Sequence, residues 1–161
     1  MTSKHLGRQT VRLGSPVSVL SYANIGGKQE AQGPLAGYFD ELNQDAYFGQ
    51  KSWEKGESAM QQFALRRAME KGGLIPEDLD YVLAGDLLNQ CIGTSFSLRD
   101  FKIPFYGLYG ACSTMGESLS LAALLIDGGF ASIVAAMTSS HFCTAERQYR
   151  MPVLYGNQRT P

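Results

Sequence analysis

The chain has 161 residues, of which 44% are hydrophobic and 18% charged, and its 14 basic side chains nearly balance 15 acidic ones. This composition excludes an intrinsically disordered chain, and a net charge of −1 argues against nucleic acid as a partner. The length suits one domain or part of a larger one. The longest apolar run, residues 119–126, is far too short to span a membrane, and residues 1–20 lack the apolar core of a signal peptide. Three cysteines without metal-ligand spacing fit a reducing compartment and indicate no metal site.

The N-terminal third of the chain gives weak structural signals. Residues 1–15 are polar and are expected to be loosely ordered. Residues 16–21 alternate apolar and small polar side chains, which predicts a strand. Residues 22–55 are rich in Gly, Asn, Gln and Asp and predict a long irregular excursion, with a short helix around residues 34–42.

Periodicity is clearer in the middle of the chain. Met60, Phe63, Ala64 and Met69 lie at helical spacing and predict a helix over residues 57–71, which the next two glycines end. Residues 75–80 predict a turn, and the continuous apolar run at 81–84 predicts a buried strand of a parallel sheet. A helix is expected within residues 87–101.

The remaining elements complete an α/β pattern. A short strand over 103–106, a helix over 114–127 and a buried strand over 131–137 are predicted. Strands that alternate with helices favour a largely parallel sheet. The helix over 114–127 is apolar nearly all round, which is typical of a helix inside a protein. Residues 151–161 bring new apolar side chains without completing an element, so we expect the fold to continue elsewhere.

Cys112 is the strongest chemical feature of the sequence. It lies between an extended segment and the start of the apolar helix, where backbone N–H groups and the helix dipole favour a thiolate. Small neighbours, Gly110, Ala111 and Ser113, leave room for access from a pocket. The alternative is a cysteine that packs as a small hydrophobic residue. Spacing alone does not decide between them.

A resemblance to a known family rests on several tracts. The segment Tyr109-Gly110-Ala111-Cys112-Ser113-Thr114-Met115-Gly116-Glu117 resembles the nucleophile turn of the thiolase and β-ketoacyl-synthase superfamily. A more specific similarity covers nearly the whole chain, because Trp53-Glu54-Lys55-Gly56-Glu57-Ser58, Gly85-Asp86-Leu87-Leu88-Asn89-Gln90 and Tyr155-Gly156-Asn157-Gln158-Arg159-Thr160-Pro161 resemble the stage V sporulation protein AD family of spore-forming bacteria.

This resemblance implies a thiolase-like fold of two similar α/β halves, of which the chain is the N-terminal half, the C-terminal half being absent. It implies non-enzymatic binding of dipicolinic acid (pyridine-2,6-dicarboxylate), alone or as the calcium chelate, for uptake into the developing spore and release in germination. It implies no cofactor, membrane-protein partners of the same stage V sporulation A operon, and peripheral association with the spore inner membrane. A homodimer is also implied, with residues 131–137 pairing across the two-fold axis.

The superfamily resemblance places Cys112 at the nucleophile position, while the catalytic histidine would lie in the other half. Met115 departs from the superfamily pattern of a small residue and is expected to narrow the space for a thioester chain.

Further candidate ligand residues follow the strands. Ser139, Ser140 and His141 come directly after the strand at 131–137, and the ends of parallel strands are where α/β folds bind ligands. Together with Cys112 and Ser113 they are candidate contacts for a dicarboxylate, although a histidine satisfied by backbone groups is the plainer interpretation of His141.

Polar side chains also follow the strand at 81–84 and later in the chain. Asp86 and Asn89 either fix the Cys112 loop or act as turn and cap residues. Arg147 and Arg150 are either partners for carboxylates or solvated surface charges.

Two functions therefore stay open. The first is the binding of dipicolinate near Cys112. The second is a thiolase-type or ketoacyl-synthase-type acyl transfer with Cys112 as nucleophile, which needs a base and an oxyanion hole.

Overall fold

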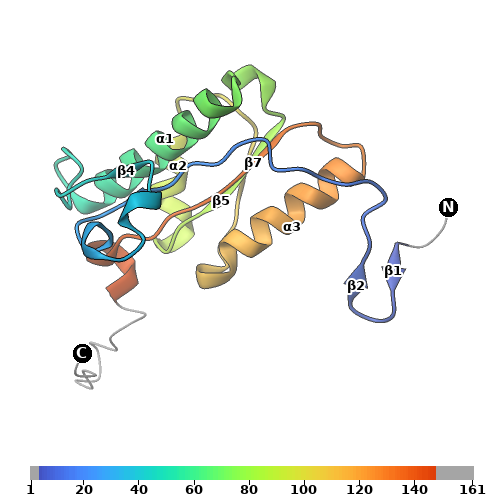
Figure 1. Cartoon of the computed structure of the whole chain (residues 1–161), viewed down its shortest axis with the longest axis horizontal. Helices are drawn as coiled ribbons and strands as arrows, with labels where there is room; N and C mark the ends of the chain where they lie inside the picture. The colour runs from blue at the N-terminus through green and yellow to red at the C-terminus, as the bar shows by residue number, and fades with distance from the viewer. Residues whose placement is uncertain (1–3, 148–161) are drawn as a thin grey trace.

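A three-stranded parallel sheet forms the centre of the computed structural model, which describes residues 4–147 (Figure 1). Its strand order is β6 (Phe105–Gly107), β5 (Tyr81–Gly85) and β7 (Val134–Thr138). In register, Val82 lies opposite Phe105 on one side and Ala135 on the other. The predicted α/β class with a parallel sheet is confirmed, and the strands predicted over residues 81–84, 103–106 and 131–137 each begin within three residues of the observed ones.

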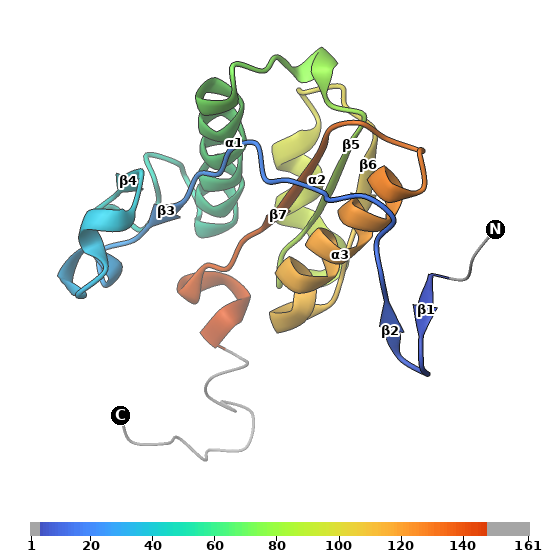
Figure 2. The same ribbon diagram turned by 45° about the vertical axis from the view of Figure 1, so that its right-hand side comes forward.

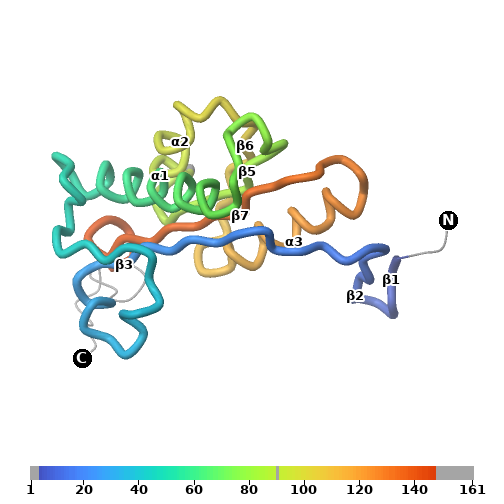
Figure 3. The backbone as a smooth tube through the Cα atoms, turned by 45° about the horizontal axis from the view of Figure 1, so that its top comes forward, coloured from blue at the N-terminus to red at the C-terminus, as the bar shows by residue number. Residues whose placement is uncertain are grey.

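Helices cover both faces of this sheet. α1 (Trp53–Gly72) packs against α2 (Ile92–Leu98), whereas α3 (Thr114–Asp127) packs against β5 and β7. Val82 and Ala84 share a core with side chains of α1 and α2. Leu83 points to the other face, as successive strand residues do, and it is also buried. Figure 3 shows α2 on one side of the strands and α3 on the other.

α1 is longer than predicted and buries a different face. It begins one turn earlier, where the Ser52 side chain accepts a hydrogen bond from Lys55 N, and it ends at Gly73, which has φ +65°. Its buried side chains lie four residues apart and include Met69, as predicted, whereas Met60, Phe63 and Ala64 are only half-buried. The buried stripe consists of Glu57, Gln61, Leu65 and Met69.

The helix expected within residues 87–101 is present as α2, which occupies only part of that range. A short 3₁₀ helix, Asn89–Cys91, precedes α2, and Cys91 has φ 55°. The cause is Asp86, whose carboxylate accepts hydrogen bonds from Leu88 N (2.8 Å) and Thr94 N (2.7 Å). A side chain that binds nearby amides in this way holds the chain in a turn instead of a helix.

The segment expected to be loosely ordered contains an anchored hairpin. β1 (His5–Leu6) pairs antiparallel with β2 (Thr10–Val11). The residues on either side of this hairpin are fixed to the end of α3, because Asp127 accepts hydrogen bonds from Lys4 Nζ (2.6 Å) and from the amide of Gly14 (2.7 Å).

Residues 16–21 are extended, but they pair with no strand among residues 4–147, so the predicted strand is wrong. Instead they form a strap that runs alongside β7 between α1 and α3 (Figure 3). Val19 and Leu20 on this strap are exposed.

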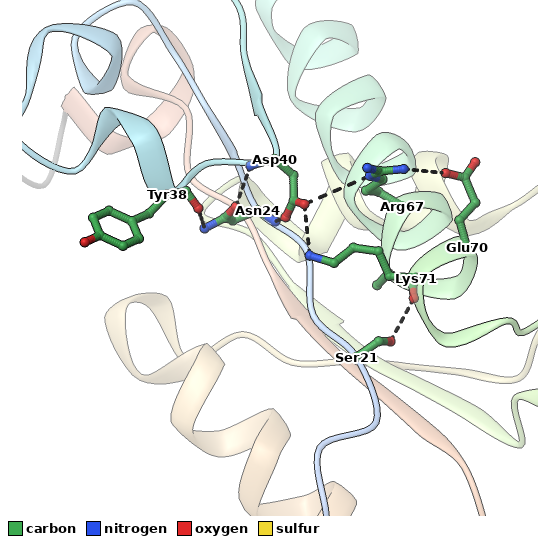
Figure 4. Close-up of polar contacts among 8 residues, drawn as sticks. Ser21, Asn24, Tyr38, Asp40, Arg67, Glu70 and Lys71 are labelled. Atoms are coloured by element: carbon green, nitrogen blue, oxygen red, sulfur yellow. Dashed lines mark hydrogen bonds and ion pairs between the residues drawn. The ribbon is translucent and has the colours of Figure 1, made fainter.

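The irregular excursion is real, although it ends at Ser52 and holds short elements where a helix over 34–42 was expected. β3 (Ile25–Gly26) pairs in parallel with β4 (Glu41–Leu42), and two 3₁₀ turns, Glu30–Gln32 and Ala36–Tyr38, lie between them. Figure 4 shows how it is joined to α1: Asp40 binds Lys71 Nζ at 2.9 Å and exchanges hydrogen bonds with Asn24.

α3 has the predicted bounds but not the predicted burial. The side of α3 turned to the sheet carries small residues, Thr114, Ser118 and Ala122, which permit close approach. Several of its larger apolar side chains stay exposed in residues 4–147. Figure 2 shows that no other helix of the described residues lies against the side of α3 turned away from the sheet. The exposed set is Met115, Leu119, Leu121 and Leu124.

Candidate functional site

The carboxyl ends of the parallel strands meet around Gly85, the last residue of β5. Its carbonyl oxygen accepts a hydrogen bond from Ser139 N at 3.1 Å, which joins it to the segment after β7. On another side, a Cβ at position 85 would lie 1.9 Å from Leu108 O and 3.0 Å from Thr114 Cγ2. These contacts bring the segment after β6, the start of α3 and the segment after β7 to the same edge of the sheet.

A buried carboxylate lies behind this edge. Glu57 on α1 is 1% exposed and accepts two hydroxyl hydrogen bonds, from Ser139 Oγ to Oε1 (2.6 Å) and from Thr144 Oγ1 to Oε2 (2.8 Å). The Ser139 oxygen also accepts a hydrogen bond from Gln61 Nε2 at 2.5 Å. One turn of α1 thus fixes the residues that follow β7.

The hydrogen bonds continue from α1 into α2. Gln61 Nε2 also donates to Thr94 Oγ1 (3.1 Å), and Thr94 Oγ1 donates to the Asp86 carboxylate (2.5 Å). Ser97 Oγ donates to Gln61 Oε1 at 2.6 Å. We call these residues the Glu57 network: Glu57, Gln61, Asp86, Thr94, Ser97 and Ser139. A buried network in which each polar group has a partner fixes one geometry of its surroundings.

Burial raises the pKa of the Glu57 carboxyl above its usual range, and the nearby charge of Asp86 acts in the same direction. The hydroxyls of Ser139 and Thr144 oppose this rise because they bind the ionised form, as does the position of His141. Desolvation is the largest of these effects, so the protonated form of Glu57 is favoured relative to an exposed glutamate.

A groove of about 800 Å³ opens beside this network. The strap, α1, α3 and β7 form its walls, which are mainly apolar and include Met60, Leu65 and Leu119. Its polar end carries Glu57, Gln61, Ser139 and Ser140. No lysine or arginine is among the described residues that line it.

The structure places the residues predicted after β7 in different settings. Ser139 lies in the Glu57 network and lines the groove. Ser140 also lines the groove, and its hydroxyl donates to Glu146. His141 is buried, with its Nε2–H directed to Ala46 O (2.7 Å) and its Nδ1 accepting Cys143 N–H (3.1 Å). Both imidazole nitrogens therefore form hydrogen bonds with backbone groups, which matches the interpretation of His141 as a histidine satisfied by the backbone.

The residues after β5 act as turn formers. Asp86 is buried and binds the start of α2, as described above, and it thereby fixes the far side of the Glu57 network. Asn89 lies in the 3₁₀ helix before α2 and is exposed.

Cys112 is exposed in a 3₁₀ turn, Ala111–Ser113, directly before α3. It is not among the residues that line the groove, so the expected cavity beside its sulfur is not the one found here. Ser113 is also exposed, and its hydroxyl donates to Gly110 O at 2.8 Å. Met115 lines the groove.

Sequence reasoning missed Glu57, Gln61 and Thr94 as parts of the site. Glu57 and Gln61 lie one helical turn apart on the same stripe as Leu65 and Met69. The available signal was that these two polar residues share a helix face with apolar residues of the core, which predicts that they are buried and hydrogen-bonded.

Residues 4–147 contain neither a membrane-spanning helix nor a metal-binding cluster. No helix there combines the length and apolarity needed to cross a bilayer. No cluster of three or more His, Cys, Asp or Glu side chains in that range has an arrangement suited to a metal ion. Arg147 is exposed at the end of the last helical turn, and Arg150 lies outside the described residues.

The chain is similar to a known protein family, to one of its members and, over part of its length, to a solved structure. Residues 7–161 match the family described as stage V sporulation protein AD (SpoVAD). Stage V sporulation protein AD of Bacillus subtilis (strain 168) is 43% identical over 156 residues, which cover 97% of this chain and 46% of that protein. The chain thus spans about half the length of this relative. Among solved structures, 3-oxoacyl-[acyl-carrier-protein] synthase III from Aquifex aeolicus VF5 is similar over 53% of this chain and 30% of its own, with a TM-score of 0.48 and 20% identity.

Proposed function

Because the chain belongs to the stage V sporulation protein AD family, we propose that it serves sporulation by binding dipicolinic acid, for uptake into the spore and release from it. The observation that carries this proposal is the groove, whose apolar walls end in a group of hydroxyl and amide side chains. A flat aromatic ring suits the apolar walls. Its carboxylates can accept from the Ser139 and Ser140 hydroxyls once these turn away from their present acceptors, Glu57 and Glu146. The Cys112 turn lies at the same edge of the sheet and is included in the proposal as a further contact.

Charge favours the calcium chelate as one bound form. The groove has no lysine or arginine among its described lining residues, and it has a buried carboxyl, Glu57, at its polar end. A dianion gains little in such a place, because no opposite charge compensates for its lost hydration. A diacid whose charge is neutralised by bound calcium avoids this cost.

Isothermal titration calorimetry on the full-length protein tests the proposal. Dipicolinate is titrated with and without calcium into the wild type, Ser139→Ala and the control Ser120→Ala, whose hydroxyl binds only its own helix at Gly116 O. We expect binding by the wild type and the control and weaker binding by Ser139→Ala. Absence of heat in the wild type at millimolar dipicolinate, with and without calcium, would reject dipicolinate as the ligand.

The same proposal includes the setting of the protein. We place it at the spore inner membrane beside membrane-embedded proteins of the same operon, and as a homodimer in which the free edge of β7 pairs with its copy. β7 is an end strand of the described sheet, which supports the second part. Sedimentation equilibrium of the full-length protein checks the dimer, and co-purification with spore membranes checks the location.

Acyl transfer by Cys112 is the alternative, and the exposure of this thiol favours it. The described histidines give it no base. His141 uses both ring nitrogens on backbone, and His5 lies on the hairpin tied to the far end of α3, whose 14 residues span about 21 Å. Mass spectrometry of the full-length protein after incubation with acetyl-CoA tests this alternative, because an unmodified Cys112 rejects it.

A further inference from the structure

The hydroxyl of Ser139 is committed by its neighbours. Its single proton points to Glu57 Oε1 at 2.6 Å, and its oxygen accepts from Gln61 Nε2 at 2.5 Å. A hydroxyl has only one proton to donate. Ser139 therefore has no donor left for a ligand while Glu57 is ionised.

Protonation of Glu57 reverses this hydrogen bond. A protonated carboxyl has an O–H of its own, which donates to Ser139 Oγ, and the second lone pair of that oxygen is available to accept it. The Ser139 O–H then turns toward the groove, which Ser139 lines. Thr144 continues to donate to the other carboxyl oxygen of Glu57.

We infer that Glu57 is a positioning residue that makes the groove a proton-coupled site for carboxylates. This inference rests on the proposed function: when free dipicolinate binds in the groove, the protein takes up one proton from solvent. This proton goes to Glu57, the Glu57 O–H then donates to Ser139, and the Ser139 O–H is released to a ligand carboxylate. The loss of the Glu57 charge also removes the repulsion between two anions in a buried place.

Asp86 and His141 are the charged or ionisable groups that act on Glu57 from neighbouring elements, and two further carboxyls lie close in the sequence to Glu57 or to its partner Thr144. Asp86 lies at the end of β5, His141 follows β7, Glu54 is one turn earlier on α1, and Glu146 follows Thr144 and accepts from Ser140. Desolvation raises the pKa of Glu57, which brings its protonation closer to neutral pH. The pKa of Glu54 is lowered, chiefly by its own backbone N–H at the start of α1, so Glu54 stays ionised where Glu57 titrates. His141 lies close enough to act on the Glu57 carboxyl and therefore needs its own variant.

Calorimetry of the full-length protein with metal-free dipicolinate tests the inference. Titrations between about pH 5.5 and 8.5, where both ligand carboxylates are ionised, are repeated in two buffers of different ionisation enthalpy. The proteins are the wild type, Glu57→Gln, His141→Asn and the control Glu70→Gln, which lies exposed on the outer side of α1. Gln at position 57 imitates the protonated acid, because its NH₂ donates to Ser139 and its oxygen accepts from Thr144.

We expect the wild type, Glu70→Gln and His141→Asn to take up about one proton on binding, with the dissociation constant rising about tenfold per pH unit above the Glu57 pKa. Glu57→Gln is expected to take up none and to keep a constant affinity. Wild-type binding without proton uptake, or coupling that disappears in His141→Asn and persists in Glu57→Gln, would overturn the inference. Binding of the calcium chelate alone, with none of free dipicolinate at any pH, would also overturn it and leave the proposed function standing. Absence of binding in either form would reject the proposed function itself.

Discussion

Gly85 and Leu108 approach so closely that a Cβ on residue 85 would stand 1.9 Å from the Leu108 carbonyl oxygen. Gly85 also lies between Thr114 and the Ser139 segment, so this contact sets the geometry of the whole strand edge. We expect Gly85→Ala to reduce the free energy of unfolding by about 3 kcal/mol, since the backbone on the other side must move. Urea unfolding of the full-length protein measures this.

Gly116→Ala is the matched control for that substitution. A Cβ at Gly116 meets nothing within 4 Å, and the residue lies inside α3. Alanine is favoured over glycine in a helix by up to about 1 kcal/mol, so a small gain is expected. An unaltered urea midpoint in Gly85→Ala would refute the close packing described here.

The contact between Lys4 and Asp127 should hold the hairpin to α3. The hydrogen bond from Lys4 keeps the pKa of Asp127 below its usual range. The contribution of this contact to the stability of the folded protein is therefore present above the unfolded pKa of Asp127, about 3.9, and it is lost as the pH falls through the lower pKa of Asp127 in the folded state. We expect Asp127→Asn to speed amide exchange at Gly14 and Ser15, both of which donate to Asp127. Unchanged exchange at these amides, relative to the exposed-pair variant Asp100→Asn, would contradict the anchor.

Glu57 should make the protein less stable as the pH rises. Burial raises the pKa of Glu57 in the folded state. The contribution of protonated Glu57 to the stability of the folded protein is therefore fully present below the unfolded pKa of about 4.3, and it is lost as the pH rises through the folded pKa. We expect the melting temperature of Glu57→Gln to rise relative to that of the wild type as the pH increases. Differential scanning calorimetry at several pH values measures the gap, with Glu70→Gln as the exposed control. A gap that is independent of pH would count against an ionisable Glu57.

The outer face of α3 should need a cover. Leu124 is 45% exposed in residues 4–147, and Leu121, one helical turn earlier, is 37% exposed. An apolar face of this kind is unfavourable in water. We expect residues 1–161 alone to show no cooperative thermal transition and to bind a hydrophobic dye. Leu124→Ser should reduce the dye signal more than Leu35→Ser, which lies exposed on the excursion. A sharp cooperative melt of residues 1–161 would contradict this prediction.

The order of the regular elements could be predicted from the sequence because local patterns determine it. The run at 81–84 contains only residues suited to a doubly covered strand, and β5 occupies this place. Gly73 ended α1 as expected, since only glycine adopts its positive φ at low cost.

Features that depend on distant contacts could not be predicted. Residues 16–21 have the alternation of a strand, but a strand also needs a hydrogen-bonding neighbour, which no local pattern reveals. Glu57 looked like a first-turn acidic residue, and its burial follows from the packing of α1 against the segment after β7. The position of Cys112 was correct, but its place outside the groove depends on how the turn before α3 is oriented.

Crystals of the full-length protein grown with dipicolinate will show where this ligand binds. We expect density for a flat diacid at the polar end of the groove, with a carboxylate oxygen within hydrogen-bond distance of Ser139 Oγ or Ser140 Oγ. Well-defined dipicolinate elsewhere on the protein, with the Ser139 hydroxyl still directed to Glu57 and the groove empty, would contradict this expectation.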